Sequence, residues 1–186
     1  FVGRERSISA VDSALTKDRL VLCATQKDIS KEDPEPADLY TTGTVCMIMR
    51  MLKLPDGRVK VLVQGLTRAN VNKFVETAPS YIVGITKVKE PASAQVPLEV
   101  EALMRNVKEN LEKLATYGKS VFQEVMMIID NIQDPGRMAD LVAANLGLKI
   151  DEAETILETL DPVLRLKKVG EFLVKELQVL QVQSKI

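Results

Sequence analysis

The apolar pattern of this 186-residue chain changes its period near residue 90. Before that point apolar residues mostly alternate with polar ones, as they do in strands, and after it they recur every three or four residues, as they do in helices. The joint, residues 90–97, holds two prolines and small residues without periodicity, which is typical of a linker. The sequence therefore predicts an α+β protein with a β-rich lobe over residues 1–90, a linker over 91–97 and an all-α bundle over 98–186.

We expect the β-rich lobe to be a small twisted sheet or partial barrel with one short helix. Ile8, Val11 and Leu15 are spaced for one face of a helix over about residues 4–17. Pro55-Asp56-Gly57 stands between two apolar runs, a strong hairpin signal. The predicted strands cover residues 20–25, 44–54, 58–64, 66–76 and 80–89, and an acidic, proline-interrupted loop covers 28–38.

Local start and stop signals divide the helical part. Glycines that end apolar patterns predict helix C-termini, and Asp-Pro pairs predict an N-cap followed by proline at the first helical position. Ser-x-x-Gln and Asp-x-x-Glu spacings predict capping boxes. These signals are Gly118, Ser120 with Gln123, Asp134-Pro135, Gly147, Asp151 with Glu154, and Asp161-Pro162.

The last predicted helix begins at Asp161-Pro162 and continues to Ile186. Apolar residues along it alternate between spacings of three and four, which is typical of a coiled-coil seam. The seam either pairs with another subunit or packs on the preceding helices, and we expect the second half of the helix to protrude. The seam residues are Val163, Leu166, Leu173, Leu177 and Leu180, with a hole at Gly170 and a polar end at Ser184.

The composition excludes several kinds of chemistry. The chain has no His, the commonest general base and metal ligand. Cys23 and Cys46 lie in apolar strand-like runs, so we expect buried, reduced thiols, with a disulfide between them as the alternative. The acidic loop over 28–38 lacks the ligand spacing of a calcium loop. We therefore predict no catalytic residues and no metal site in this chain.

The methionines are the side chains best suited to contact many partners, because methionine is flexible and polarizable. Met47 alternates with Met49 and Met51 along a predicted strand, and Met126 and Met127 are adjacent on a predicted short helix. We predict that Met47, Met126 and Met127 contact a binding partner, and packing in the core is the alternative.

The sequence also limits the partners. No apolar stretch approaches the ~18 residues that span a bilayer, and the start lacks the layout of a signal peptide. A net charge of −1 offers little attraction to phosphates, so nucleic acid is an unlikely partner. The chain starts at Phe1 and not at Met, so we expect it to be a piece of a longer protein.

Four segments resemble sequences of bacterial Lon proteases, in the same order along nearly the whole chain. They run from Phe1 to Ile8 (FVGRERSI), from Asp38 to Val45 (DLYTTGTV), from Leu54 to Leu66 (LPDGRVKVLVQGL) and from Asp134 to Asp140 (DPGRMAD). The last is similar to the family's Asp-Pro-x-x-Leu-Ala-Asp.

The resemblance implies the N-terminal region of a hexameric, ATP-dependent protease. In that family a lobe like the pseudouridine-synthase-and-archaeosine-transglycosylase (PUA) fold precedes a helical bundle, and a long helix leads to the ATPase module. The ATPase and Ser-Lys protease domains would follow Ile186, so this chain would hold no cofactor, while the parent would use ATP and Mg. The family's opening strand, which precedes Phe-Val-Gly-Arg, is missing, so an edge of the sheet is expected to be exposed.

These expectations give a function. We expect the chain to be a non-catalytic, cytoplasmic region that recognises unfolded or damaged proteins, here called clients, through apolar surface. The resemblance also implies that it supports assembly with other Lon subunits into a homo-hexamer. A stand-alone RNA- or ligand-binding PUA-like module is the alternative. Seven aromatic residues and a charge of −1 leave little for base stacking or phosphate contact.

Overall fold

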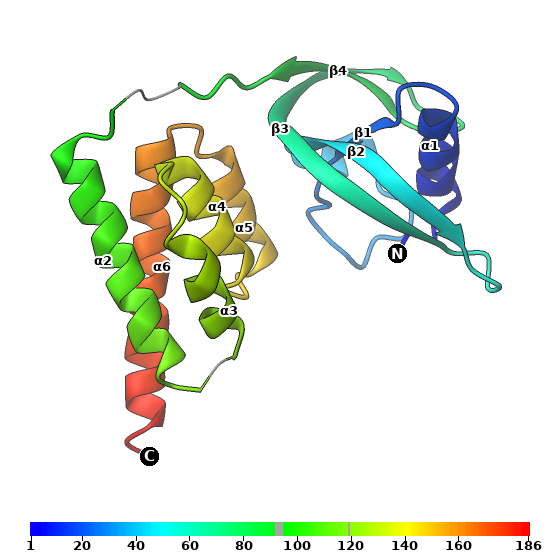
Figure 1. The fold of residues 1–186 in the computed structure, drawn as a ribbon. Coiled ribbons are helices and arrows are strands. Elements are labelled where there is room, and N and C mark those ends of the chain that lie inside the picture. Colours follow the sequence, from blue (N-terminus) through cyan, green and yellow to red (C-terminus); the bar gives the residue numbers. More distant parts are fainter. Residues whose placement is uncertain (92–94, 119) are drawn as a thin grey trace. The chain divides into compact units, whose positions relative to one another are not determined.

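The computed structural model describes residues 1–91, 95–118 and 120–186, without the side chain of Ser120, and separates into two compact units, Phe1–Lys89 and Glu90–Ile186 (Figure 1). Among the described residues, the first unit, the β unit, has an antiparallel sheet and one α-helix, and the regular elements of the second, the helical unit, are all helices. The α+β class predicted from the sequence is confirmed.

The β unit begins with helix α1 (Glu5–Leu15), followed by β1 (Leu20–Cys23), the 3-10 turn η1 (Pro36–Asp38), β2 (Thr42–Lys53), β3 (Val59–Glu76) and β4 (Ile82–Lys87). The strands pair in the order β1-β2-β3-β4. The predicted strands over 58–64 and 66–76 form one long strand, β3, which curves across the unit in Figure 1. Gly65 pairs with Cys46 and Thr67 with Val45, so Leu66 forms a bulge and the pairing continues past it.

The β2–β3 hairpin turns where Pro55-Asp56-Gly57 predicts it. The N–H of Gly57 donates to the carbonyl of Leu54 over 3.1 Å, and the N–H of Leu54 donates to the carbonyl of Arg58 over 2.9 Å. Gly57 has a φ of +87°, in the left-handed region that favours glycine. The Asp56 carboxylate accepts from the N–H of Arg58 over 3.0 Å, so local chemistry fixes this turn.

A second bulge, between Ile48 and Arg50, breaks the predicted alternation of Met47, Met49 and Met51 on one face of β2. Arg19 holds the bulge, because its Nε donates to the carbonyl of Ile48 over 2.9 Å and its Nη2 to the carbonyl of Met49 over 3.3 Å. Ile48 and Met51 therefore both pack towards Val11 and Ala14 of α1, while Met49 is exposed.

The helical unit consists of α2 (Leu98–Ala115), α3 (Ser120–Ile129), α4 (Pro135–Ala144), α5 (Ile150–Glu158) and α6 (Pro162–Gln183). Helices α2 and α4 both pack on α6, and α3 packs on α2. Their inward side chains form one continuous core that includes Leu111, Ile129, Val142 and Leu173, all fully buried. The apolar faces therefore close on one another within the unit.

Most of the predicted helix ends agree with the structure. Asp134 caps α4 by accepting from Gly136 N–H over 2.7 Å, and Asp161 caps α6 by accepting from Leu164 N–H over 2.8 Å. Gly118 and Gly147 follow α2 and α4 with positive φ. The cap predicted at Asp151 is wrong: α5 starts at Ile150 and its N-cap is Lys149, whose N–H donates to the Glu152 carboxylate over 3.2 Å. The Ser120–Gln123 box lies outside the described residues, because it needs the Ser120 side chain.

Candidate functional site

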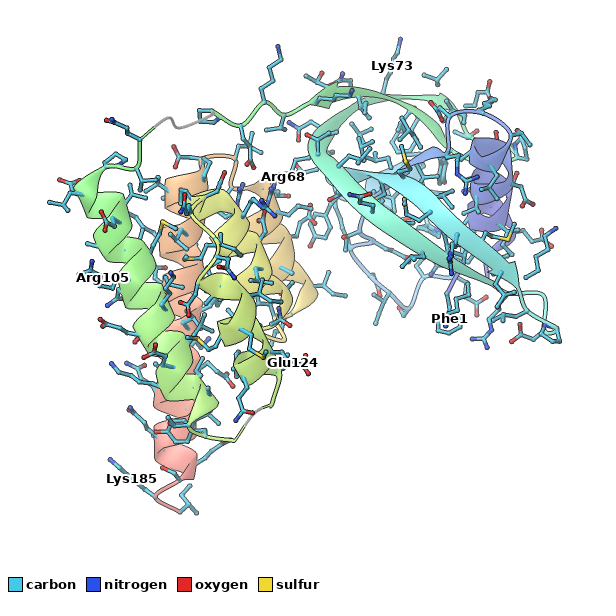
Figure 2. The ribbon with its side chains drawn as sticks, in the orientation of Figure 1. Phe1, Arg68, Lys73, Arg105, Glu124 and Lys185 are labelled. Atoms are coloured by element: carbon cyan, nitrogen blue, oxygen red, sulfur yellow. The ribbon has the colours of Figure 1, made fainter. Side chains whose placement is uncertain are left out.

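Helix α3 is apolar on both its inner and its outer side. Phe122, Val125 and Ile129 face the core and are almost fully buried. Val121, Met127 and Ile128 are exposed, Met127 by 79% of its surface. Glu124 extends from α3 on the side away from α2 (Figure 2). A surface helix normally has one apolar stripe, so we name the set Val121, Met127 and Ile128 the α3 surface and take it as the first candidate site.

The structure distinguishes among the three predicted contact methionines. Met127 lies on the α3 surface, whereas Met126 is half-buried and packs against the core of the helical unit. Met47 is half-buried in β2 and pairs with Leu20 and Gln64. Of the three, only Met127 offers most of its side chain to a partner, and the contact role of all three stays a prediction.

The predicted seam of α6 lies inside the helical unit. Leu166 and Leu173 are fully buried, Leu177 is 6% exposed, and Val163 and Leu180 pack against the same core. Gly170 faces α2, because a Cβ on it would lie 3.9 Å from Val107 Cγ2. Within this unit the seam residues follow the intramolecular alternative, since helices of the same unit pack against them. Their role between subunits stays a prediction.

A second exposed apolar set lies on the β2–β3 hairpin. Leu52 pairs with Lys60 and Leu62 pairs with Arg50, so the two leucines share a face of the ladder with two cations. Leu52 is 59% and Leu62 60% exposed. This hairpin surface holds two exposed apolar side chains where the α3 surface holds three, and it includes two cations.

The β unit also contains an open cavity of about 1230 Å³, bordered by α1, by β1 and β4, and by the loop that includes Pro34. Arg6 lines this cavity and has several polar contacts. Its Nη1 lies 3.3 Å from Asp33 and hydrogen-bonds the Tyr81 hydroxyl, and its guanidinium lies 4.4 Å from the centre of the Tyr81 ring. The Tyr81 hydroxyl in turn donates to the carbonyl of Pro34 over 2.7 Å. These contacts give Arg6 a structural role, holding the loop to α1.

The two cysteines are free thiols in different surroundings. Cys46 is buried, whereas Cys23 is exposed, so the expectation of two buried thiols is wrong for Cys23. Burial, and then the neighbouring Cys23, raise the pKa of the Cys46 thiol to about 12. Because the thiolate is the reactive form, Cys46 is inert at neutral pH.

The described residues offer no metal site: among them, no group of three or more His, Cys, Asp or Glu side chains could hold a metal ion. None of the described helices combines the length and the apolar character that crossing a bilayer requires.

Comparison with known protein families shows which family this chain belongs to. The family described as "ATP-dependent protease La (LON) substrate-binding domain" matches residues 1–175. The chain belongs to this LON domain family. The resemblance seen in the four sequence segments is thereby confirmed.

Relatives of this LON domain are much longer proteins. The Lon protease of Geobacter metallireducens is 56% identical over 186 residues, which are 100% of this chain and 23% of that protein. The Lon protease of Trichlorobacter lovleyi has the same identity and coverage. This LON domain therefore spans less than a quarter of the length of these relatives.

Solved structures support the fold. The "N terminal domain of Mycobacterium avium complex Lon protease" superposes with a TM-score of 0.70 and 21% sequence identity, and covers 94% of this chain and 88% of that one. At this identity the similarity establishes the fold alone.

Proposed function

We propose that this LON domain holds extended apolar segments of unfolded or damaged client proteins for the protease to which it is joined. The observation that carries the proposal is the α3 surface: Val121, Met127 and Ile128 are all exposed on a helix whose inner side is buried. Flexible aliphatic side chains can adapt to many sequences, at the expense of close fit to any one, so binding should be weak. The family description as a substrate-binding domain supports this assignment.

The direct test measures binding of reduced, carboxymethylated α-lactalbumin, a permanently unfolded probe, by fluorescence anisotropy. The variant M127S/I128S should weaken binding at least about fivefold, which corresponds to the loss of about 1 kcal/mol that separates contributing interface residues from neutral ones. The matched control L164S/V174S changes two aliphatic residues of α6 that are 48% and 42% exposed, and it should leave binding unchanged.

Salt dependence separates an apolar surface from a charged one. Affinity should change less than about twofold between 0.05 and 0.5 M NaCl, because screening acts on charges and not on apolar contact. An affinity that falls steeply with salt, or equal losses in both variants, would refute the α3 surface as the client site.

We also propose that copies of the chain contact one another through the last turns of α6, as part of assembly in the parent protease. Val179 and Val182 are exposed there, while the seam residues are covered. Sedimentation velocity should show weak, concentration-dependent association that V179S/V182S abolishes. Identical sedimentation of both proteins at all concentrations would contradict this assignment.

The wider activity is proposed for the parent protein only. We propose that the parent protein carries out ATP-dependent proteolysis in the cytoplasm and binds ATP and Mg outside these 186 residues. The family description, which names an ATP-dependent protease, and the Lon proteases among the longer relatives support the proteolytic part of this proposal. The chain alone should hydrolyse neither ATP nor casein.

A further inference from the structure

The methionines of the chain differ widely in how well the fold protects their sulfur atoms. Met104 and Met138 lie in the core of the helical unit, with 8% and 0% of their surface exposed. Met127 on α3 is 79% exposed, and the next most exposed methionine, Met49 on β2, is 47% exposed. The half-buried methionines are Met47, Met51 and Met126. A small reagent in water therefore reaches Met127 most easily.

The side chains beside Met127 along the chain are polar. Gln123 and Glu124 lie one helical turn before it, and Asp130 and Asn131 follow the end of α3. All four are exposed, and Glu124 extends from α3 on the side away from α2 in Figure 2. By contrast, Met126 packs against the core. These polar neighbours leave the thioether of Met127 in contact with water.

An exposed thioether reacts with hydrogen peroxide by taking up one oxygen atom. The sulfur lone pair attacks one oxygen of the peroxide, so that an S–O bond forms and the O–O bond breaks. The departing hydroxide removes the proton from the transferred oxygen, which yields water and methionine sulfoxide. Sulfur is oxidised and the peroxide is reduced. The product is a polar side chain in place of an apolar one.

We propose that Met127 is a reversible oxidation site through which peroxide weakens the binding of clients to the α3 surface. This inference rests on the proposed function, because it assigns a regulation to the same surface. A sulfoxide oxygen that enters an apolar contact must give up its hydrogen bonds to water, which opposes binding. Methionine sulfoxide reductases return the side chain to methionine, so the loss of binding is reversible.

The burial of the core methionines separates this regulation from damage to the fold. A polar sulfoxide at Met104 or Met138 would disrupt the apolar core around them. Peroxide does not reach these two sulfur atoms while the helical unit is folded, because the surrounding side chains cover them. A low dose of peroxide therefore changes the α3 surface and leaves the core intact.

The first measurement is the rate of oxidation at each methionine. The whole 186-residue chain is treated with hydrogen peroxide, the reaction is stopped with catalase, and peptide masses give the fraction of sulfoxide at each position. Met127 should react at least about twofold faster than Met49 and at least about tenfold faster than Met138, because the oxidant must reach the sulfur. Faster oxidation of Met49 or Met138 than of Met127 would overturn the proposal.

The second measurement compares binding of reduced, carboxymethylated α-lactalbumin before and after the treatment, with the peroxide removed before the probe is added. Oxidation should weaken binding by the unmutated chain at least about threefold, and methionine sulfoxide reductases A and B should restore it. Each variant is compared with its own untreated form. Treatment should weaken M127L less than about 1.5-fold, whereas the matched control M49L, which keeps Met127, should lose as much as the unmutated chain.

The outcomes distinguish this proposal from the proposed function. If M127S/I128S weakens client binding and oxidation of Met127 does not, the α3 surface remains the client site and the oxidation proposal is wrong. If M127S/I128S binds the probe as the unmutated chain does, the proposed function is wrong and the oxidation proposal fails with it. Equal sensitivity of M127L and M49L to peroxide would also overturn the oxidation proposal, because the loss would then arise at another residue.

Discussion

The two units of this chain are stabilised in different ways. In the helical unit, α2, α3, α4 and α6 bury one continuous set of aliphatic side chains. In the β unit, the core cluster centres on Val11, Ala14 and Ile48, beside an open cavity of about 1230 Å³. There, strand pairing and polar contacts such as those of Arg6 and Arg19 connect the elements. The helical unit therefore has a much larger continuous apolar core than the β unit, where polar contacts add to the connection between elements.

The largest expected effect comes from opening the continuous core. Leu173→Ala should destabilise the helical unit by about 2 to 5 kcal/mol, the usual cost of a cavity left by a fully buried leucine. Unfolding in denaturant, followed by amide hydrogen exchange in peptides from each unit, would show whether the β unit keeps an unfolding transition of its own. Loss of both transitions together would mean that the two units do not fold independently.

A smaller effect on the stability of the helical unit depends on pH. Glu154 on α5 is buried, and burial, followed by the nearby Glu158, raises the pKa of its carboxyl from 4.5 to about 7. The folded state therefore keeps a proton that the unfolded chain releases, so stability falls as the pH rises from about 4.5 through about 7. At pH 8 Glu154→Gln should stabilise the helical unit by about 1 to 3 kcal/mol.

At pH 4.5 the same substitution should have little effect, because the native carboxyl is then protonated. The control is Glu171→Gln, at an exposed position of α6, which should be neutral at both pH values. Thermal unfolding at the two pH values makes the measurement. A gain from Glu154→Gln that is equal at both pH values would show that titration is not its cause.

The smallest expected effect tests the β unit. Gly57→Ala should destabilise it by about 1 kcal/mol, because a Cβ strains a residue with positive φ although nothing lies within 4 Å of it. Gly57→Asn should cost less, since asparagine tolerates this conformation. Gly65→Ala, in β3 without positive φ, serves as the control in a thermal melt. A neutral Gly57→Ala would mean that the turn can relax.

The sequence predicted those features that depend on neighbours along the chain. The Asp134-Pro135 and Asp161-Pro162 starts, the glycine stops and the Pro55-Asp56-Gly57 turn each need only local chemistry. The β2 bulge was missed because Arg19, about thirty residues away in the sequence, holds it. Heptad spacing alone also could not decide whether Leu166 and Leu173 face another subunit or their own bundle, since both solutions use the same apolar stripe.

For the candidate site, the sequence identified Met127 but not the whole α3 surface. Val121 and Ile128 belong to an almost continuously apolar segment, in which periodicity does not separate an inner from an outer side. The composition of this segment could have indicated the α3 surface. A short helix with few polar residues has more apolar surface than one contact face can bury, so some of its apolar side chains must be exposed.

The two cysteines of the β unit differ in exposure, so a thiol reagent can reach one of them and not the other. Cys23 is exposed on β1, an edge strand of the sheet, while the thiol of its neighbour Cys46 is buried and stays protonated near neutral pH. A maleimide dye at mild pH would therefore attach at one position of the natural sequence. The label would report on that edge of the sheet, and no engineered residue would be needed to place it.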